Sequence, residues 1–297
     1  IKNISGTIAA LSSGKGMAGI SVIRVSGKHT KDIFTKITNK KPEHMRATYT
    51  GFYSANALEI DAGVALFFAG PNSYTGEDIC EFSVHGSPAV VEMMLERAFE
   101  LGARQAQPGE FTKRAYLNDK LDLIQAEAVA DLIESVSTKT AMAAKRSLSG
   151  EFSNRVNKLL GDVTKIRALV EATLDFSDQD LDETKHPEAL MSATRETKES
   201  FQALIRQTRT GIRVRDGLVI TILGKPNVGK SSLFNMICGS DRAIVNSKAG
   251  TTRDIVSESI SIDGFPIRVL DTAGIRESED EIEQEGIKRA IEAGDSA

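Results

Sequence analysis

The segment Gly224–Ser231 holds the residues whose types and spacing most directly indicate chemistry. It reads Gly-Lys-Pro-Asn-Val-Gly-Lys-Ser, which is the pattern of a phosphate-binding loop. Successive backbone N–H groups in such a loop point inward and, with the N-terminus of the following helix, form an anion site. Lys230 would then contact the β- and γ-phosphates, and the Ser231 hydroxyl would bind Mg²⁺. The segment predicts that the chain binds a nucleoside triphosphate.

The elements around this segment are those that a phosphate-binding loop requires. The apolar run Leu218–Leu223 predicts a buried strand before the loop, and Ser232–Cys238 predicts the first turns of a helix after it. A second predicted strand, Ile267–Leu270, ends at Asp271, and P-loop proteins hold their metal at such an acidic strand end, directly or through water. Between the strands, the polar segment Gly250–Asp254 offers a threonine hydroxyl to the same Mg²⁺. This order of features argues against a chance match to the loop pattern.

Length and composition limit the class of protein. The chain has 297 residues, of which 40% are hydrophobic and 26% charged, so it allows two or three ordinary domains and excludes disordered and fibrous classes. No apolar run is long enough to cross a bilayer and the N-terminus lacks a signal or transit pattern, so we expect a cytoplasmic protein without a membrane anchor. Cys80 and Cys238 each lie in an apolar run and are predicted to be buried thiols in a reducing compartment. Because the net charge is −4, contact with nucleic acid must come from a local patch.

The sequence predicts a multidomain protein in three regions. These are an α+β domain at 1–119, the first half of an α-helical domain at 120–215, and an incomplete α/β P-loop domain at 216–297. The first region has three strand-like runs and one helix ended by a glycine, namely Ile20–Val25, Ala62–Phe68, Ile79–Val84, the helix Pro88–Leu101 and Gly102. The second has two apolar stripes at helical spacing, formed by Leu121, Ile124, Ala128, Leu132 and Val136, and by Leu159, Val163, Ile166 and Val170. The acidic stretch Asp175–Glu183 predicts a loop, before a further helix from Pro187 to about Arg209.

The third region is shorter than a complete nucleotide-binding domain. Such a domain needs further parallel strands after the one that ends at Asp271, so that both faces of its sheet are covered. The sequence stops at Ala297, and no Asn-Lys-x-Asp segment, the usual guanine reader of GTPases, occurs in it. We therefore expect a fragment of a longer protein, in which base selectivity is not encoded by the residues given.

Several segments together resemble the MnmE (also called TrmE) family of tRNA-modification GTPases, over the whole chain. In the nucleotide region they are Gly224–Ser232, Gly250–Asp254 and Asp271–Gly274. In the N-terminal region they are Pro71–Asp78, His85-Gly86, Pro108–Phe111 and Leu117–Ala128. Many GTPases share the nucleotide segments, whereas the N-terminal segments and the order of domains are specific to this family.

The resemblance implies a tetrahydrofolate-binding and dimerisation domain at 1–119, then a helical domain into which the GTPase domain is inserted. The family's second helical half and its C-terminal cysteine motif follow the GTPase domain and are absent from this sequence. The implied cofactors are GTP, Mg²⁺, K⁺ and 5,10-methylene- or 5-formyl-tetrahydrofolate. The implied GTP-binding residues are Asn227, Val228, Gly229, Lys230, Ser231, Ser232, Asn246, Ser247, Lys248, Ala249, Gly250, Thr251, Thr252, Asp271, Thr272, Ala273 and Gly274.

The residue that follows Asp-Thr-Ala-Gly differs from the glutamine with which Ras orients the attacking water. It is Ile275, which cannot hydrogen-bond to water. The resemblance assigns the catalytic role to Glu283, acting through a bridging water alongside Lys230. From the residues alone, a solvated acidic face is the better explanation of Glu283, because several acids surround it: Glu277, Glu279, Asp280, Glu281 and Glu285.

The resemblance also replaces the usual arginine finger with K⁺, which acts when the GTPase domains dimerise. It assigns the side chain of Asn227 and the backbone carbonyls of Asn246 and Lys248 to the ion, with Thr251 as a further ligand. Ser231 and Thr252 match the Mg²⁺ ligands. Oxygen ligands suit both hard cations, although Asn227 could also simply shape the loop through an Asx turn. Arg253 and Arg276 are expected to make switch or dimer contacts.

Arg24, Glu81 and Lys120 match the positions that contact tetrahydrofolate in the family. A cationic side chain suits the anionic glutamate tail, and a carboxylate accepts hydrogen bonds from a pterin edge. An ion pair between two strands is the alternative explanation of Arg24 and Glu81. His85 has no partner motif nearby and is predicted to be a packed or turn residue.

The basic residues of the helical region are interspersed with acids, so an ordinary solvated face is as consistent with them as a tRNA-binding surface. They are Lys139, Lys145, Arg146, Arg155, Lys158, Lys165, Arg167, Arg206, Arg209, Arg213 and Arg215.

The resemblance implies a K⁺-dependent GTPase that is activated by dimerisation and acts in tRNA wobble-uridine modification. It would be a homodimer that binds one-carbon tetrahydrofolate and works with the FAD-dependent MnmG, in a heterotetramer, to add an aminomethyl or carboxymethylaminomethyl group at C5. One alternative is a P-loop switch for ribosome assembly, which has no use for Arg24, Glu81 and Lys120 as a set. Another is a folate-dependent transfer module with a degenerate nucleotide domain, against which the intact Lys230 and Asp271 argue.

Overall fold

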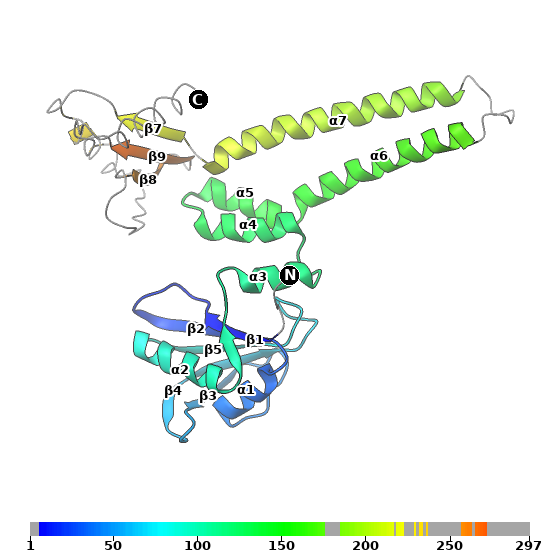
Figure 1. The fold of residues 1–297 in the computed structure, drawn as a ribbon. Helices are drawn as coiled ribbons and strands as arrows, with labels where there is room; N and C mark the ends of the chain where they lie inside the picture. Colours follow the sequence, from blue (N-terminus) through cyan, green and yellow to red (C-terminus); the bar gives the residue numbers. More distant parts are fainter. Residues whose placement is uncertain are drawn as a thin grey trace, which may run out of the picture. The chain divides into compact units, whose positions relative to one another are not determined.

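The computed structural model describes residues 6–175, 185–216, 218–222, 257–262 and 265–271, with Gly229, Ser232, Leu233 and Met236. The chain divides into two compact units, residues 1–127 and residues 128–297. Among the described residues, no helix is both long enough and apolar enough to span a membrane. Figure 1 shows the elements of each unit.

The first unit is built on a six-stranded sheet with the strand order β3-β4-β5-β2-β1-β6. Its strands are β1 Thr7–Leu11, β2 Ala18–Ser26, β3 Thr48–Tyr53, β4 Glu59–Phe68, β5 Ile79–Gly86 and β6 Ala103–Gln105. Neighbouring strands are antiparallel except β1 and β6, which pair in parallel. The predicted strands Ile20–Val25, Ala62–Phe68 and Ile79–Val84 are confirmed as parts of β2, β4 and β5.

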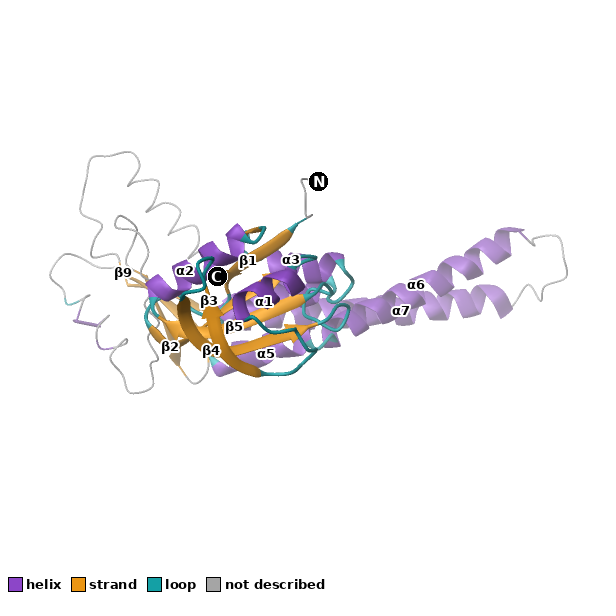
Figure 2. Ribbon diagram, turned by 90° about the horizontal axis from the view of Figure 1, so that it is seen from below, coloured by secondary structure: helices purple, strands orange, loops and turns teal. Residues whose placement is uncertain are grey.

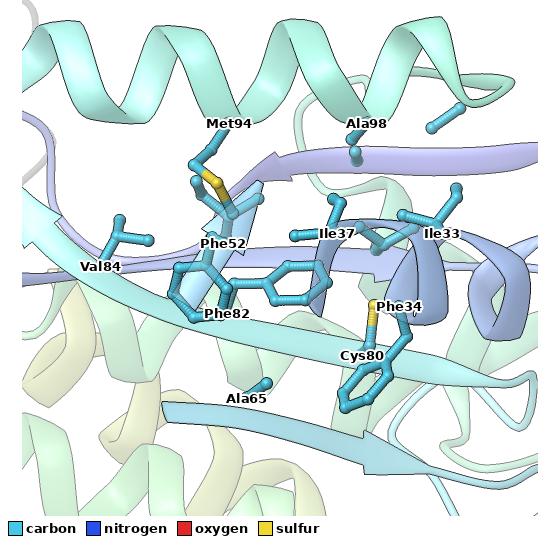
Figure 3. Close-up of a cluster of buried hydrophobic side chains, with 14 of the residues drawn as sticks. Ile33, Phe34, Ile37, Phe52, Ala65, Cys80, Phe82, Val84, Met94 and Ala98 are labelled. Carbon is cyan, nitrogen blue, oxygen red and sulfur yellow. The ribbon is translucent and has the colours of Figure 1, made fainter. Parts of the chain in front are cut away.

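Two helices, α1 (Thr30–Thr38) and α2 (Pro88–Glu100), pack on one face of this sheet. In α1 the buried Ile33, Phe34 and Ile37 recur at helical spacing, and in α2 Met94 and Ala98 lie one turn apart. Figure 3 shows these side chains meeting alternate residues of β5. The predicted helix Pro88–Leu101 is confirmed as α2. It begins with a proline, which is favoured in the first helical turn, and Gly102 follows its last turn.

Alternation along β5 decides which side chains remain available for function. Cys80, Phe82 and Val84 are buried in the core, which confirms the predicted burial of the Cys80 thiol. The residues that alternate with them along the strand, including Glu81 and His85, lie on the opposite face of the sheet. This opposite face carries the charged residues that the sequence singles out.

The helical region contains a pair of long helices. Helix α3 (Glu110–Leu117) belongs to the first unit, and the helices that follow it are α4 Leu123–Glu134, α5 Thr138–Leu148, α6 Glu151–Asp175 and α7 Lys185–Asp216. Figures 1 and 2 show α6 and α7 running side by side, and Arg155 of α6 donates a hydrogen bond to Gln207 of α7 at 2.5 Å. The helix predicted to end at about Arg209 continues to Asp216 as α7.

The apolar stripe predicted from Leu121 to Val136 is longer than the helix that carries it. Helix α4 ends at Glu134, because the Ser137 side chain caps a new helix by accepting a hydrogen bond from the backbone N–H of Thr140 at 3.2 Å. Leu121 and Val136 therefore lie outside α4. The prediction of an apolar stripe on one helix is correct for Ile124, Ala128 and Leu132.

A second sheet contains β7 (Leu218–Ile222), β9 (Phe265–Asp271) and β8 (Ser257–Ile262), in the order β7-β9-β8. The strands predicted at Leu218–Leu223 and Ile267–Leu270 are thereby confirmed as β7 and β9. These two strands are parallel, whereas β8 and β9 are antiparallel. The parallel pair is the arrangement that a P-loop segment between the strands requires.

Candidate functional site

The register of β7 and β9 brings the end of the strand that precedes the phosphate-binding segment beside the predicted acidic position. Ile222, two residues before Gly224, lies opposite Asp271 across the two strands. Both strands thus end at the same edge of the sheet, where α/β proteins bind nucleotides. Gly229 has a φ of +96°, a left-handed conformation that favours glycine. The N–H of Leu233 donates to the Gly229 carbonyl at 2.9 Å, which is the first hydrogen bond of a helix.

Most residues predicted to bind GTP and metal ions lie outside the described residues. The exceptions are Gly229, Ser232 and Asp271, and Ser232 is exposed in the helical turn after the loop. Cys238 also lies outside the described residues. So do the other predicted nucleotide, K⁺, Mg²⁺ and catalytic residues: Asn227, Val228, Lys230, Ser231, Asn246, Ser247, Lys248, Ala249, Gly250, Thr251, Thr252, Thr272, Ala273, Gly274 and Glu283. Within the part of the chain that the structure describes, no three His, Cys, Asp or Glu side chains gather to hold a metal ion.

Arg24 and Glu81, two of the three predicted folate residues, are direct cross-strand partners on β2 and β5. Arg24 donates from Nε to Oε1 of Glu81 at 2.8 Å, and its Nη2 forms an ion pair with the same oxygen at 2.7 Å. About a quarter of the Arg24 side chain (25%) and 21% of the Glu81 side chain remain exposed. Among the described residues, Nη1 of Arg24 and Oε2 of Glu81 have no hydrogen-bond partner, so the pair offers a donor and an acceptor side by side.

Two aromatic rings lie against the Arg24 guanidinium. Its central carbon is 5.2 Å from the ring centroid of Tyr74 and 5.5 Å from that of Phe111. Cation–π attraction of this kind fixes the plane and direction of an arginine. The Tyr74 hydroxyl is 2.9 Å from Oγ1 of Thr112, so the two ring-bearing segments also touch each other. Sequence analysis assigned no role to Tyr74 or Phe111, although both lie in segments that carry the family resemblance.

Lys120, the third predicted folate residue, lies beside the loop that carries Tyr74. A side chain at Gly76 would meet Cγ of Lys120 at 3.3 Å, and Gly76 itself has a φ of +78°. The N–H of Lys120 donates to the Ala115 carbonyl at the end of α3, at 2.8 Å. The structure thus brings Arg24 and Glu81 into contact, and Lys120 lies against the loop that carries Tyr74, whose ring contacts Arg24.

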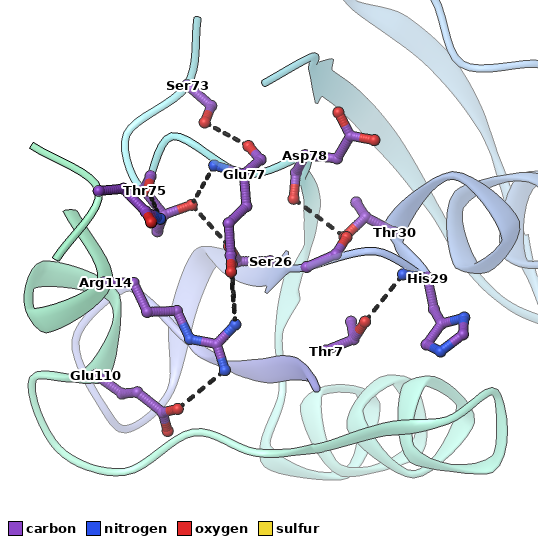
Figure 4. A network of polar contacts seen from close by, with 12 residues as sticks. Thr7, Ser26, His29, Thr30, Ser73, Thr75, Glu77, Asp78, Glu110 and Arg114 are labelled. Carbon is purple, nitrogen blue, oxygen red and sulfur yellow. Dashed lines mark hydrogen bonds and ion pairs between the residues drawn. The ribbon is translucent and has the colours of Figure 1, made fainter. Parts of the chain in front are cut away.

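A network of charged side chains, centred on the buried Arg114 and Glu110, is drawn in Figure 4. Arg114 of α3 donates to Glu77 and to Glu110, and Glu110 also receives two hydrogen bonds from Arg104 at 2.9 and 2.5 Å. Hydrogen bonding from Arg104 lowers the pKa of Glu110 to about 2, and its bonds from the Gln107 backbone and Arg114 act in the same direction. Glu110 is therefore an anion at neutral pH, although only 7% of its side chain is exposed.

His85 and Asp61 form a second polar pair on the sheet. The His85 backbone N–H donates to Oδ2 of Asp61 at 2.7 Å, and its ring Nδ1 is 2.8 Å from Oδ1. Burial by itself would raise the pKa of Asp61, but these hydrogen bonds from His85 outweigh it and lower the pKa. The prediction that His85 is a packed or turn residue is wrong, because His85 lies in strand β5 with 74% of its side chain exposed, and Asp61 pairs with it.

Several basic residues of the helical region form ion pairs within their own helix. Arg155 pairs with Glu151, and Lys165 pairs with Asp162. Arg167 contacts Glu171 at 3.3 Å. Pairs of this type are common on solvated helix faces and carry no information about tRNA.

Comparison with known families accounts for nearly all of the chain. A model of the GTP-binding protein TrmE N-terminus matches residues 7–120, and a model of the MnmE helical domain matches residues 123–295. The chain is 48% identical to the tRNA modification GTPase MnmE of Thiobacillus denitrificans over 290 residues, covering 98% of this chain and 65% of that relative. It is 45% identical to the protein of the same name from Hydrogenovibrio crunogenus over 291 residues, covering 98% of this chain and 64% of the relative.

The fold and the site together define a multidomain protein, in which an α+β unit precedes a helical region and a parallel strand pair flanking a phosphate-loop sequence. Within that class, the chain belongs to the MnmE family, because the helical-domain model alone matches more than half of its residues. The chain spans about 65% of the length of the relatives that it matches.

Proposed function

We propose that this protein hydrolyses GTP to GDP and phosphate as part of a reaction that modifies the wobble uridine of tRNA. The observation that carries the proposal is the register of β7 and β9, which sets Ile222, two residues before the phosphate-binding segment, opposite Asp271. Membership of the MnmE family supports it, since the relatives bear the name tRNA modification GTPase. The potential phosphate-loop glycine Gly229 has the required backbone conformation.

The residues proposed to act on GTP have distinct roles. Lys230 would neutralise charge on the β- and γ-phosphates, while Ser231 and Thr252 would hold Mg²⁺. The bound cations would supply stabilisation of the charge that develops on the phosphates. Glu283 would orient the attacking water, because Ile275 cannot. Asn227, the carbonyls of Asn246 and Lys248, and Thr251 are the proposed K⁺ ligands.

The pair Arg24–Glu81 is proposed to recognise the pterin of a one-carbon tetrahydrofolate, with Lys120 near the anionic tail. A pterin presents a carbonyl oxygen beside N–H groups on one edge. The free Nη1 of Arg24 and the free Oε2 of Glu81 would donate to and accept from these groups respectively. The fit rests on this donor–acceptor pair and on the partial exposure of both side chains.

The remaining family properties are part of the same proposal. We infer a folate-binding domain at 1–119, the first half of a helical domain at 120–215 and the beginning of a GTPase domain at 216–297. We also infer a cytoplasmic homodimer that works with MnmG to add an aminomethyl or carboxymethylaminomethyl group at C5 of the uridine. Family membership supports these inferences.

The GTPase proposal is tested by measuring hydrolysis by the full-length protein in KCl and in NaCl at matched ionic strength. We expect strong activation by K⁺, and loss of that activation in Asn227→Ala. The variant Asn56→Ala, at an exposed turn of the first unit, serves as a control that keeps the nucleotide residues intact. Equal, slow turnover in both salts would refute the K⁺ mechanism.

The folate proposal is tested by isothermal titration of the full-length protein with 5-formyl-tetrahydrofolate. We expect Glu81→Gln to weaken binding by about tenfold or more, because the amide is a poorer acceptor and presents a donor in its place. Glu43→Gln, a change at an exposed carboxylate that pairs with Arg46, is the matched control. If the wild-type protein binds no folate but hydrolyses GTP, a ribosome-assembly switch becomes the better explanation.

A further inference from the structure

Arg114 is the largest fully buried side chain of the described residues, with 1% of its surface exposed. Nη1 donates to both carboxylate oxygens of Glu77, at 3.1 and 2.9 Å, and Nη2 donates to Oε1 of Glu110 at 3.1 Å (Figure 4). Burying such a group costs free energy, and a buried ion pair often stabilises no more than apolar residues of the same volume would. The arrangement therefore calls for an explanation other than stability.

Glu77 is the point at which Arg114 holds the loop 71–78. Ser26 of β2 donates to Oε2 of Glu77 at 2.8 Å from the opposite side, and the Glu77 N–H donates to Oγ1 of Thr75 at 3.2 Å. Asn118, just after α3, donates to the Thr75 carbonyl at 2.7 Å. The loop is thus joined to both α3 and β2 through a carboxylate whose two oxygens are both engaged by Arg114.

The two segments that Arg114 joins are the ones that carry the aromatic rings beside Arg24. Tyr74 lies three residues before Glu77 in the loop, and Phe111 lies three residues before Arg114, about one turn earlier on α3. Both rings lie within 5.5 Å of the Arg24 guanidinium carbon. A change in the distance between loop and helix would therefore move the two rings relative to each other and turn Arg24.

We propose that Arg114 is a positioning residue for the Arg24–Glu81 pair. By bridging Glu77 and Glu110, it sets the separation of Tyr74 and Phe111, and these rings fix the direction of the free N–H groups of Arg24. The proposal rests on the proposed function, in which Arg24 and Glu81 recognise the pterin. It adds the side chain that holds this pair in a binding geometry without touching the ligand.

The test uses Arg114→Lys in the full-length protein. Lysine keeps the positive charge but lacks the planar fork that binds two carboxylates at once. We expect affinity for 5-formyl-tetrahydrofolate to fall by about tenfold, since small displacements of binding groups have effects of at least this size. Arg97→Lys is the matched control, because Arg97 is also largely buried and pairs with Glu100, but on α2. Its affinity should stay within about twofold of the wild type, in line with mutations that move no binding group.

A double-mutant cycle separates positioning from a merely structural role. If Arg114 acts through Tyr74, then Arg114→Lys should weaken folate binding little further in a protein that already carries Tyr74→Leu. The losses in melting temperature caused by the two substitutions should instead add. Additive losses of affinity would overturn the proposal, as would wild-type affinity in Arg114→Lys. If this variant does not fold, Ser26→Ala, which removes one hydrogen bond to Glu77, replaces it in the cycle with the same criterion and a smaller expected loss.

A measurement without ligand distinguishes failure of this proposal from failure of the proposed function. The rate at which phenylglyoxal modifies Arg24, followed by mass spectrometry of its peptide, reports how firmly the rings hold the guanidinium. We expect this rate to rise several-fold in Arg114→Lys and to stay at the wild-type value in Arg97→Lys. If the wild-type protein binds no folate but the Arg24 rate rises, the pterin site is wrong and the positioning role stands. An unchanged Arg24 rate would refute the positioning role.

Discussion

Replacing Glu110 with glutamine should destabilise the first unit in a way that depends on pH. Glu110 receives hydrogen bonds from Arg104, Arg114 and the Gln107 backbone, and its pKa falls from 4.5 to about 2 on folding. At about 1.4 kcal/mol per pKa unit, this shift corresponds to roughly 3 kcal/mol of stability at pH 7. Because the folded-state pKa is the lower one, the contribution is complete above the unfolded-state pKa and is lost as the pH falls from about 4.5 through about 2.

Peptide-resolved hydrogen exchange suits this measurement, because the chain has more than one unit and need not unfold in a single step. For amides of α3 and β6, we expect the opening free energy in Glu110→Gln to be about 3 kcal/mol lower than in the wild type at pH 7. At pH 3 the difference should shrink to about 1 kcal/mol.

The matched control is Glu100→Gln, which removes an exposed partner of Arg97 on α2. Its effect should stay below about 1 kcal/mol at both pH values, as for other surface pairs. A Glu110→Gln effect that is equally small, or that does not change with pH, would refute the reasoning from the depressed pKa.

Two further substitutions and one chemical modification of the wild-type protein have defined outcomes. Asp61→Asn should lower the melting temperature near neutral pH. The difference in melting temperature from the wild type should narrow as the pH falls below about 4, because pairing with His85 lowers the folded-state pKa of Asp61. A difference that stays constant with pH would contradict this. Gly63→Ala would set a Cβ 1.9 Å from the Ser83 carbonyl oxygen, so thermal unfolding should show a loss of stability of about 1–3 kcal/mol or more. An unchanged melting temperature would count against the pairing register of β4 and β5. Burial raises the pKa of the Cys80 thiol well above its usual range, so it should react with a thiol reagent only on unfolding, as peptide mass spectrometry can check.

The elements predicted correctly from sequence are those with strong local signals. Strands β2, β4 and β5 contain long β-branched or aromatic runs, and α2 begins with a proline and is followed by Gly102. Two of the missed strands, β1 and β6, lack such signals, whereas β3 (Thr48–Tyr53) was missed although it is rich in threonine and aromatic residues. Thr7–Leu11 is short and contains two alanines, and Ala103–Gln105 has three residues and exists only because it pairs with β1. Such pairing is a long-range property that no local window contains.

The candidate site was predictable in its residue types and in one contact, because an ion pair between two strands was one of the two explanations of Arg24 and Glu81 and is present. Its other contacts were not predictable. The sequence and the resemblance singled out Arg24 and Glu81, but their adjacency depends on the register of β2 and β5, which a shift of one residue would abolish. His85 and Asp61 lie on neighbouring strands and are separated by 24 positions in the chain. Nothing in the sequence around Arg114 distinguishes a buried arginine from an ordinary one on a helix surface, because its two carboxylate partners come from different segments.

The parallel pairing of β1 with β6 has a consequence for how the protein is made. Residues 7–11 leave the ribosome before the other strands of this sheet, and β2 can pair with one side of them almost at once. Their other side gains its partner only when Ala103–Gln105 has been synthesised, and at ribosomal speeds of about 5–20 residues per second this takes several seconds or more. A nascent chain that pauses between residues 86 and 103 therefore exposes an open strand edge, which is a template for association with other chains. Ribosome-bound chains ending at residue 100 should accordingly need chaperone protection that chains long enough to complete β6 do not.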